Sequence, residues 1–327
     1  MAISILSVAK DARQAAQDQA AMQKYNEQLI DALLAKGTPR AIALAATSLS
    51  YADRGSRPAI DERRLELLDR AAQMAPDDAW VQWLAVAGAT PSGSLSEPLL
   101  ALQRLAPDNG AIWLFQLRRA TQAKDNSGIN EALHRIGASS HFDDYFTTNA
   151  TEWLKFLRDY PLPETYAIAD KAMTERMVLI SANSRAAATY LPGAFSAISV
   201  CKPKSEPLTA DRRAACLAAG RLMLNQSSSL SSMAAGAAVL RAAQAADTDD
   251  ITRNQKYFTE EYAIAANEAI ANPDEIESYV SDWIQTRNEV QFARNLLTRA
   301  GIPLLPPADW KPDPQRFHSR ITARNSD

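Results

Sequence analysis

A short phrase recurs at a fixed distance in the first half of the chain. It reads Ala-Ala-Gln-Met-Ala-Pro-Asp over residues 71–77 and Leu-Gln-Arg-Leu-Ala-Pro-Asp over residues 102–108, 31 residues later. A weaker copy, Leu-His-Arg-Ile-Gly-Ala-Ser, follows after another 31 residues, over 133–139. A period of about 20 to 50 residues is typical of stacked repeats, in which each unit buries its apolar face against its neighbours. The pattern therefore predicts a solenoid.

The composition favours helices. The 327 residues include only 11 glycines, about half of the usual share of ~7%, and alanine-rich runs recur throughout. Residues 195–201 form the one short candidate strand. We therefore expect an all-α fold, an α-α superhelix of helix pairs.

Apolar spacing and breaker residues divide the chain into helices. They predict helices near 7–35, 39–51, 59–74, 208–224, 228–245, 252–271 and 273–300, with further helices around Trp80, Trp113 and Trp153 and over 163–182. Residues 191–207 contain Pro, Gly and Ser and read as a connection. We expect a repeat lobe over 1–190, a second lobe over 208–300 and an extended tail over 301–327.

The repeat phrase resembles tetratricopeptide-type repeats. That family commonly places an alanine five positions before a proline at the end of its second helix, as Ala71 and Pro76 are placed here. Trp80, Trp83 and Trp113 supply large residues early in the next helices. The resemblance covers about residues 60–140, and it implies stacked helix pairs that bind other proteins. The sequence departs from the family's pattern in two ways: its period is shorter, and Ala138 stands where the proline is expected.

Several polar clusters coincide with expected helix starts. Asp77-Asp78 and Asp143-Asp144 are interpreted as caps for free backbone N–H groups rather than as catalytic carboxylates, and the serines of 227–232 as an N-cap cluster. The three histidines, His134, His141 and His318, show no metal-ligand spacing. No phosphate-binding or nucleophile motif occurs. We predict no cofactor, no metal and no enzymatic activity.

The two cysteines, Cys201 and Cys216, flank a proline-containing loop that leads to a helix start at Thr209. A disulfide here would close that loop onto the helix, and it would indicate an oxidising compartment such as the periplasm. Two free thiols would indicate the cytoplasm. The apolar start of the chain is too short for a signal peptide, so a periplasmic protein would be the mature form without its leader.

Charge excludes some partners and leaves others. The chain carries a formal charge of −3 with no basic stripe, so we predict no nucleic-acid binding, and no apolar run reaches the ~18 residues of a membrane helix. Exposed aromatic and arginine side chains would be the anchors for a protein partner. The candidates are Arg63, Arg64, Trp83, Trp113, Arg118 and Arg119. The alternative is that the tryptophans belong to the core and the arginines to a solvated face.

We expect a non-enzymatic protein-binding solenoid of the bacterial cell envelope. It would act as a scaffold or adaptor, or as an immunity-type protein that neutralises a toxic effector of a secretion system. The alternatives are an all-α hydrolase that uses groove carboxylates and a carrier of a small ligand or peptide. A deep pocket of perturbed acids would favour the hydrolase, and a closed apolar cavity would favour the carrier.

Overall fold

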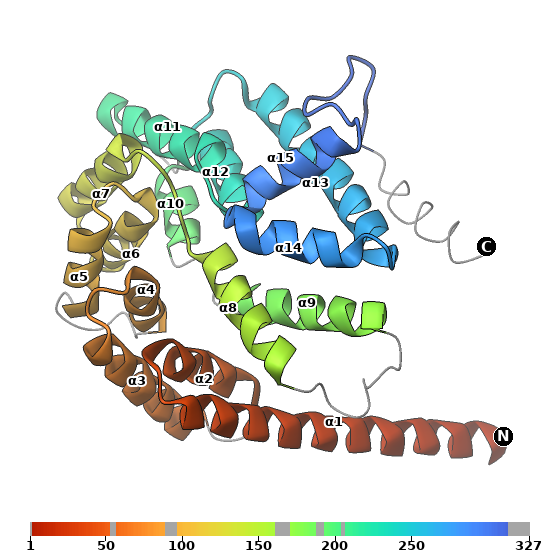
Figure 1. Cartoon of the computed structure of the whole chain (residues 1–327). Helices are drawn as coiled ribbons and strands as arrows, with labels where there is room; N and C mark the ends of the chain where they lie inside the picture. The colour runs from red at the N-terminus through yellow and green to blue at the C-terminus, as the bar shows by residue number, and fades with distance from the viewer. Residues whose placement is uncertain are drawn as a thin grey trace. The chain divides into compact units, whose positions relative to one another are not determined.

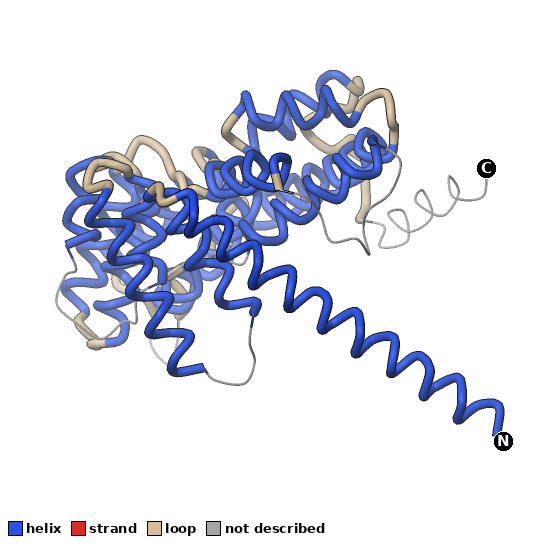
Figure 2. The backbone as a smooth tube through the Cα atoms, turned by 60° about the horizontal axis from the view of Figure 1, so that its bottom comes forward, coloured by secondary structure: helices blue, strands red, loops and turns tan. Residues whose placement is uncertain are grey.

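The structure, a computed structural model, describes residues 2–52, 57–88, 97–160, 171–187, 193–203 and 207–312, with side chains from residue 19 onward except 50–52 and 57–61. Within these ranges the regular structure is helical, with no strand and two isolated β-bridges (Figure 2). The predicted all-α fold is confirmed. His318 and the tail beyond residue 312 lie outside the described residues.

The chain forms two compact units, and neither is continuous in sequence. The first unit comprises 1–90, 95–101 and 152–189, and the second comprises 91–94, 102–151 and 190–327. This differs from the predicted division at 191–207, because residues 102–151 pack with the C-terminal helices. Sequence proximity favours neighbouring helices, but the burial of apolar faces decides which helices share a core.

In the first unit, helices α1 to α4 each pack against the next one along the chain (Figure 1). The unit contains α1 (Ala2–Lys36), α2 (Pro39–Ala52), α3 (Arg57–Met74), α4 (Ala79–Gly88), α9 (Lys171–Ala187), the start of α5 (Glu97–Leu105) and the end of α8 (Phe146–Asp159). Arg40 of α2 binds Asp78 before α4 at 2.7 Å and Glu152 of α8 at 3.0 Å. These ion pairs tie three segments of the unit together.

In the second unit, a row of helices packs in the order α6, α7, α11, α12, α13, although α8 to α10 lie between α7 and α11 in sequence. Its elements are the end of α5, η1 (Gly110–Ile112), α6 (Trp113–Gln122), α7 (Asn126–Ala138), the start of α8, α10 (Ala194–Val200), α11 (Ala210–Asn225), α12 (Leu230–Ala242), α13 (Thr248–Ala271), α14 (Ile276–Thr286) and α15 (Glu289–Arg299). The candidate strand at 195–201 is thus helix α10, packed against α6 and α12, so the predicted connection over 191–207 is wrong for these residues. Helices packed in adjacent pairs are compatible with a helical solenoid.

The repeat phrase ends one helix and starts the next. Helices α3 and α5 stop at Met74 and Leu105, before the prolines, as predicted. The capping side chains follow the repeated aspartates: Asp78 accepts from the Trp80 amide at 3.2 Å, and Asn109 accepts from the Ala111 amide at 3.1 Å. The two caps are again 31 residues apart. The 31-residue repeat therefore also includes the residue whose side chain caps the following helix.

Helices α11 and α12 approach each other closely because glycine lies between them. A Cβ on Gly236 of α12 would lie 2.4 Å from the Leu224 backbone nitrogen, and a Cβ on Gly220 of α11 would lie 2.7 Å from the Leu240 side chain. Hydrogen at these positions lets the two backbones meet. Ala237, Leu240 and Ile251 fill the core beside this contact.

The predicted single helix over 273–300 is wrong: the segment forms α14 and α15. Arg287 adopts a left-handed conformation with φ of 50°, and the Asn288 side chain then caps α15 by accepting from the Gln291 amide at 2.8 Å. The break brings α14 and α15 together over α13. Phe292 of α15 packs edge-on against Tyr279 and Trp283 of α14 at centroid distances of 4.9 and 5.2 Å.

The described part of the tail, residues 301–312, packs on α13. The Trp310 ring meets Tyr257 edge-on at 5.3 Å, and Arg253 donates to the carbonyl oxygens of Pro307 and Ala308. This part of the predicted extended tail is therefore packed against a helix of the second unit.

Candidate functional site

Three separate loop segments of the second unit meet at one joint, which we call the serine–carboxylate joint: residues 109–110, 139–145 and 227–232, with Glu289. Isolated bridges pair Asn109 with His141 and Phe142 with Ser227. Phe142 donates to the Gln226 carbonyl at 2.9 Å and accepts from the Ser228 amide at 2.9 Å. The loop before α8 is thereby held between η1 and the start of α12.

Asp144 lies at the centre of the joint and is 8% exposed. One carboxylate oxygen accepts from the Ser229 and Ser232 hydroxyls at 2.5 and 2.6 Å, and the other accepts from the Phe146 amide at 3.1 Å. Burial raises the pKa of the Asp144 carboxyl, and the hydrogen bonds from the serines oppose that rise. The carboxyl thus caps α8 and binds the first turn of α12 together.

Two further carboxylates complete the joint. Asp143 accepts from the Ser228 hydroxyl at 2.6 Å, and Glu289 accepts from the Leu230 amide at 2.8 Å while its own amide donates to the Ser228 carbonyl at 2.7 Å. Burial raises the pKa of Glu289 to about 7, and the Asp144 charge adds to the rise. Ser229 also caps α12 by accepting from the Ser232 amide at 3.1 Å. The predicted capping roles of Asp144 and Ser229 are confirmed.

The chemistry open to the joint follows from these contacts. A general acid or base needs a carboxyl within hydrogen-bond reach of a substrate, whereas both Asp144 oxygens are occupied by serines and a backbone amide. His134 binds Asp211 at 3.1 Å and His141 binds Ser140 at 3.1 Å. Within the described ranges, no group of three His, Cys, Asp or Glu side chains could hold a metal ion. The contacts therefore describe a structural joint.

The predicted disulfide between Cys201 and Cys216 is present, with 5.7 Å between the Cα atoms. Cys201 follows the last residue of α10, Cys216 lies on α11, and both are fully buried. Thr209 caps α11 by accepting from the Arg212 amide at 3.2 Å, as predicted. The disulfide closes the loop onto the helix that follows it.

Three of the predicted partner-binding residues lie in the first unit. Arg63 is exposed on α3. Arg64 is half-buried and donates to the Gly88 carbonyl at 3.1 Å. Trp83 on α4 is 2% exposed, so its indole belongs to the core of the unit.

The other three lie on α6 in the second unit. Trp113 is half-buried, with the Arg135 guanidinium 5.3 Å from its ring centroid. Arg119 is exposed, and Arg118 is half-buried, so that burial lowers its pKa. The structure thus brings Trp113 and the two arginines onto one helix.

The sequence did not predict that these loops meet in the serine–carboxylate joint. The serine run and the Asp143-Asp144 pair were the signals of it that the sequence contained.

Comparison with protein-family models, with curated proteins and with solved structures finds no match to this chain. The helices of the described ranges are each too short or too polar to cross a membrane.

Proposed function

We propose that the protein is a non-enzymatic, tetratricopeptide-like helix-pair protein that binds another protein in the bacterial cell envelope. In this role it is a scaffold or adaptor, or an immunity-type protein that neutralises a toxic effector.

The proposal is carried by the serial packing of α6, α7, α11, α12 and α13. Helices that each pack against the next expose a continuous surface, which stacked-repeat proteins use to bind extended partners. Function inferred from such packing is an analogy between folds.

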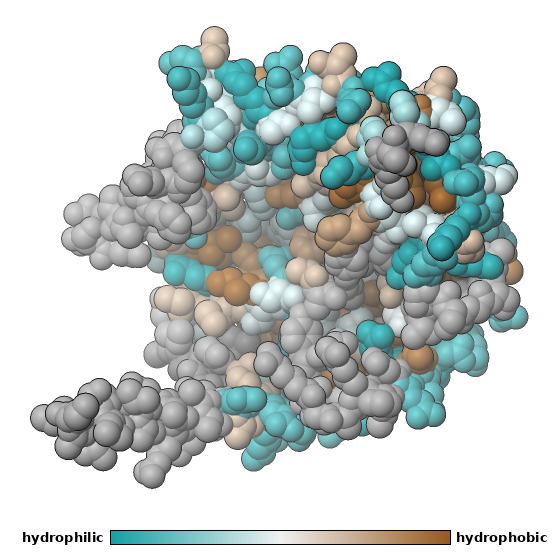
Figure 3. All heavy atoms as spheres, turned by 180° about the vertical axis from the view of Figure 1, so that it is seen from behind, coloured by the Kyte–Doolittle hydropathy of each residue, from teal (hydrophilic) through white to brown (hydrophobic). Residues whose placement is uncertain are grey.

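An exposed aromatic residue on the same unit marks where a partner could be anchored. Phe195 of α10 is 71% exposed, and α10 packs against α6 and α12 of the helix row. Aromatic side chains are over-represented among the residues that dominate binding energy. Hydrophobic and hydrophilic side chains both reach the surface seen in Figure 3. We place Phe195 with Trp113, Arg118 and Arg119 of α6 as candidate contacts.

The disulfide supports an oxidising compartment, and we propose the periplasm. Disulfides persist outside the cytoplasm, whereas thiols inside the cytoplasm are kept reduced. A periplasmic binding protein could serve either envelope assembly or protection from a secreted effector. These two roles predict different partners.

The hydrolase alternative has one observation in its favour, the raised pKa values of Asp144 and Glu289. Perturbed carboxyls cluster at active sites, but structural networks perturb them as well. Here Asp144 is almost fully buried and bonded at both oxygens, which favours the structural role.

The proposal is tested by affinity purification of the tagged protein from the cells that make it, with Phe195→Ala as the surface variant and Leu305→Ala as the control. Leu305 is 65% exposed in the tail. We expect a stoichiometric partner that Phe195→Ala reduces at least fivefold and Leu305→Ala retains. A partner that is toxic alone and harmless on co-expression identifies the neutraliser, and several envelope proteins identify the scaffold. If the wild type and both variants capture no partner, the proposal is overturned.

A further inference from the structure

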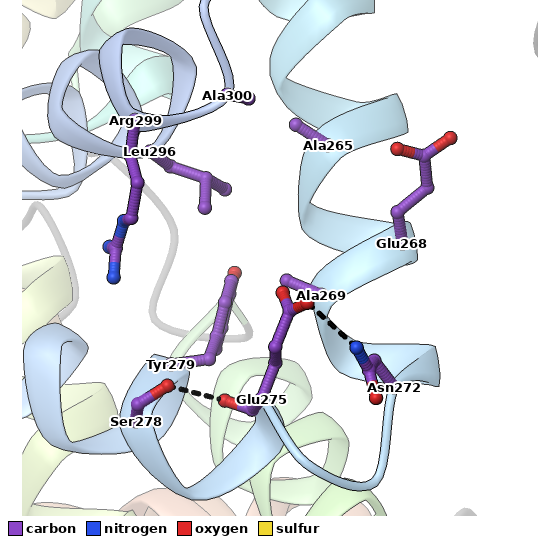
Figure 4. Close-up of a pocket in the computed structure, with 10 residues that line it drawn as sticks. All are labelled: Ala265, Glu268, Ala269, Asn272, Glu275, Ser278, Tyr279, Leu296, Arg299 and Ala300. Carbon is purple, nitrogen blue, oxygen red and sulfur yellow. Dashed lines mark hydrogen bonds between the residues drawn. The ribbon is translucent and has the colours of Figure 1, made fainter.

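A cavity of about 410 Å³ lies between α13, α14 and α15 of the second unit (Figure 4). This volume falls within the ~300–1,000 Å³ of typical ligand pockets. Its walls combine small apolar residues with a few polar ones, and α13 and α15 supply most of the apolar part. The apolar lining residues are Ala265, Ala269, Leu296 and Ala300.

Two of the three charged residues that line the cavity are acidic. Figure 4 shows the Glu275 carboxylate reaching into the space, where it accepts from the Asn272 amide at 2.7 Å. Glu268 of α13 also contributes to the lining, but Figure 4 shows its carboxylate on the side of the helix turned away from the space. Arg299 enters from α15, but it already binds Asp282 at 2.7 Å. The lining residues and this partner therefore carry a net negative charge.

A pair of neighbouring phenols, Tyr279 and Tyr262, adjoins the cavity. Tyr279 is 5% exposed, and Figure 4 shows its hydroxyl directed into the space. That hydroxyl meets the Tyr262 hydroxyl at 3.4 Å, and burial raises the pKa of Tyr279 to about 12. Both phenols are therefore protonated at neutral pH, and one hydrogen bond between them uses one proton of two.

The segment that supplies most of the cavity lining carries charge of one sign only. Residues 257–286 contain seven Asp or Glu residues and no Lys or Arg, whereas the whole chain has a formal charge of only −3. The segment covers most of α13 and all of α14. Its field attracts cations to the cavity mouth.

We propose that this cavity receives a lysine or arginine side chain presented by an extended segment of the partner protein. The methylene stem of such a side chain packs on Ala265, Ala269 and Leu296, and its cationic head meets the Glu275 carboxylate. Arginine and lysine bury their stems against apolar surface in this manner. The inference rests on the proposed function, because it names the chemistry of the partner.

An anionic occupant fits the cavity less well. Arg299 is the only cationic residue among those that line it, and Asp282 neutralises that charge. A phosphate or carboxylate would also meet Glu275 directly. The occupant is accordingly cationic at one end and aliphatic along its length.

The test uses the full chain, labelled with ¹³C at alanine and leucine methyl groups, and a blocked peptide, acetyl-Gly-Arg-Gly-amide. The matched probe replaces arginine by citrulline, which has the same shape without the charge. We expect the arginine peptide to shift the methyl resonances of Ala265, Ala269 and Leu296 at millimolar concentration. The citrulline peptide should bind at least about fivefold more weakly, the size of an exposed charge pair.

Variants locate the contact. Glu275→Gln keeps the bond from Asn272 and removes the charge, so it should weaken the arginine peptide by about fivefold. Asp274→Asn is the control, because Asp274 is exposed beside the cavity but does not line it. Equal binding of both peptides, no methyl shifts, or equal effects of the two variants would each overturn the cavity proposal.

This outcome is separable from that of the proposed function. If Glu275→Gln captures the cellular partner as well as the wild type does, the cavity proposal fails and partner binding stands. If no partner is captured, the peptide titration still decides whether the cavity accepts a cationic side chain.

Discussion

The Ser229 hydroxyl donates to the buried Asp144 carboxylate over 2.5 Å, although 85 residues separate the two in sequence. The same Ser229 oxygen accepts from the Ser232 amide and caps α12, and the same carboxylate caps α8. One hydrogen bond thus joins the starts of two helices. Such networks gain strength from low local polarity and are costly to leave incomplete.

Ser229→Ala should therefore destabilise the second unit by about 2–3 kcal/mol, because it removes an N-cap and one hydrogen bond to a buried carboxylate. Urea unfolding at pH 7 measures the change. Ser199→Ala is the control, since Ser199 is exposed on α10 and should change stability by less than ~0.5 kcal/mol. A loss below ~1 kcal/mol for Ser229→Ala would mean that Ser232 alone satisfies Asp144.

The protonation of Glu289 makes the joint sensitive to pH. Burial raises its pKa from 4.5 to about 7 in the folded chain, so the folded state holds a proton that the unfolded state has released. The free energy of unfolding is then greatest below pH ~4.5 and falls as the pH rises through 7. The pKa of Asp144 is raised as well, which adds in the same direction.

From pH 5 to pH 8, we expect the wild type to lose about 1–3 kcal/mol of stability, each pKa unit corresponding to ~1.4 kcal/mol before discounting for partial exposure. Glu289→Gln keeps an acceptor for the Leu230 amide without the charge, so most of this slope should vanish. Glu62→Gln, at an exposed position of α3, should keep it. Urea unfolding at several pH values gives the comparison, and an unchanged slope in Glu289→Gln would assign the effect to other groups.

Local rules predicted the features that depend on neighbouring residues. Proline and glycine predicted the ends of α1, α3 and α5, Thr209 was predicted as a cap, and the serine run 227–232 was predicted to contain one, which is Ser229. The cysteine pair was found from its position around one loop. In each case, the interacting groups lie within about 15 residues, where spacing fixes the geometry.

Features that depend on distant contacts were missed. The serine run predicted a cap but gave no sign of Asp144, because nothing local relates residues so far apart. The break at Arg287 was also missed, since its left-handed backbone is supported by the packing of α14 against α15. The division into two units follows from which faces are buried, and a contiguous boundary could not reproduce it.

The disulfide should stabilise the second unit by about 3 kcal/mol, because it closes a ring of 15 residues in the unfolded chain. Cys201→Ala with Cys216→Ala should lose that amount in urea unfolding. Thiol titration of the unfolded, unreduced wild type should detect no free thiol. Two titrated thiols would remove the argument for an oxidising compartment.

Alanine substitutions at Trp83 and Trp113 should distinguish a core tryptophan from a surface one. Trp83→Ala should destabilise the first unit by about 3 kcal/mol or more, because the indole is 2% exposed and its removal leaves a cavity. Trp113→Ala should cost only about 1 kcal/mol, since its half-buried ring mainly packs under Arg135. Urea unfolding measures both, and partner capture should fall for Trp113→Ala if α6 is a contact surface. A loss below ~1 kcal/mol for Trp83→Ala, with partner capture abolished, would instead place Trp83 at the interface.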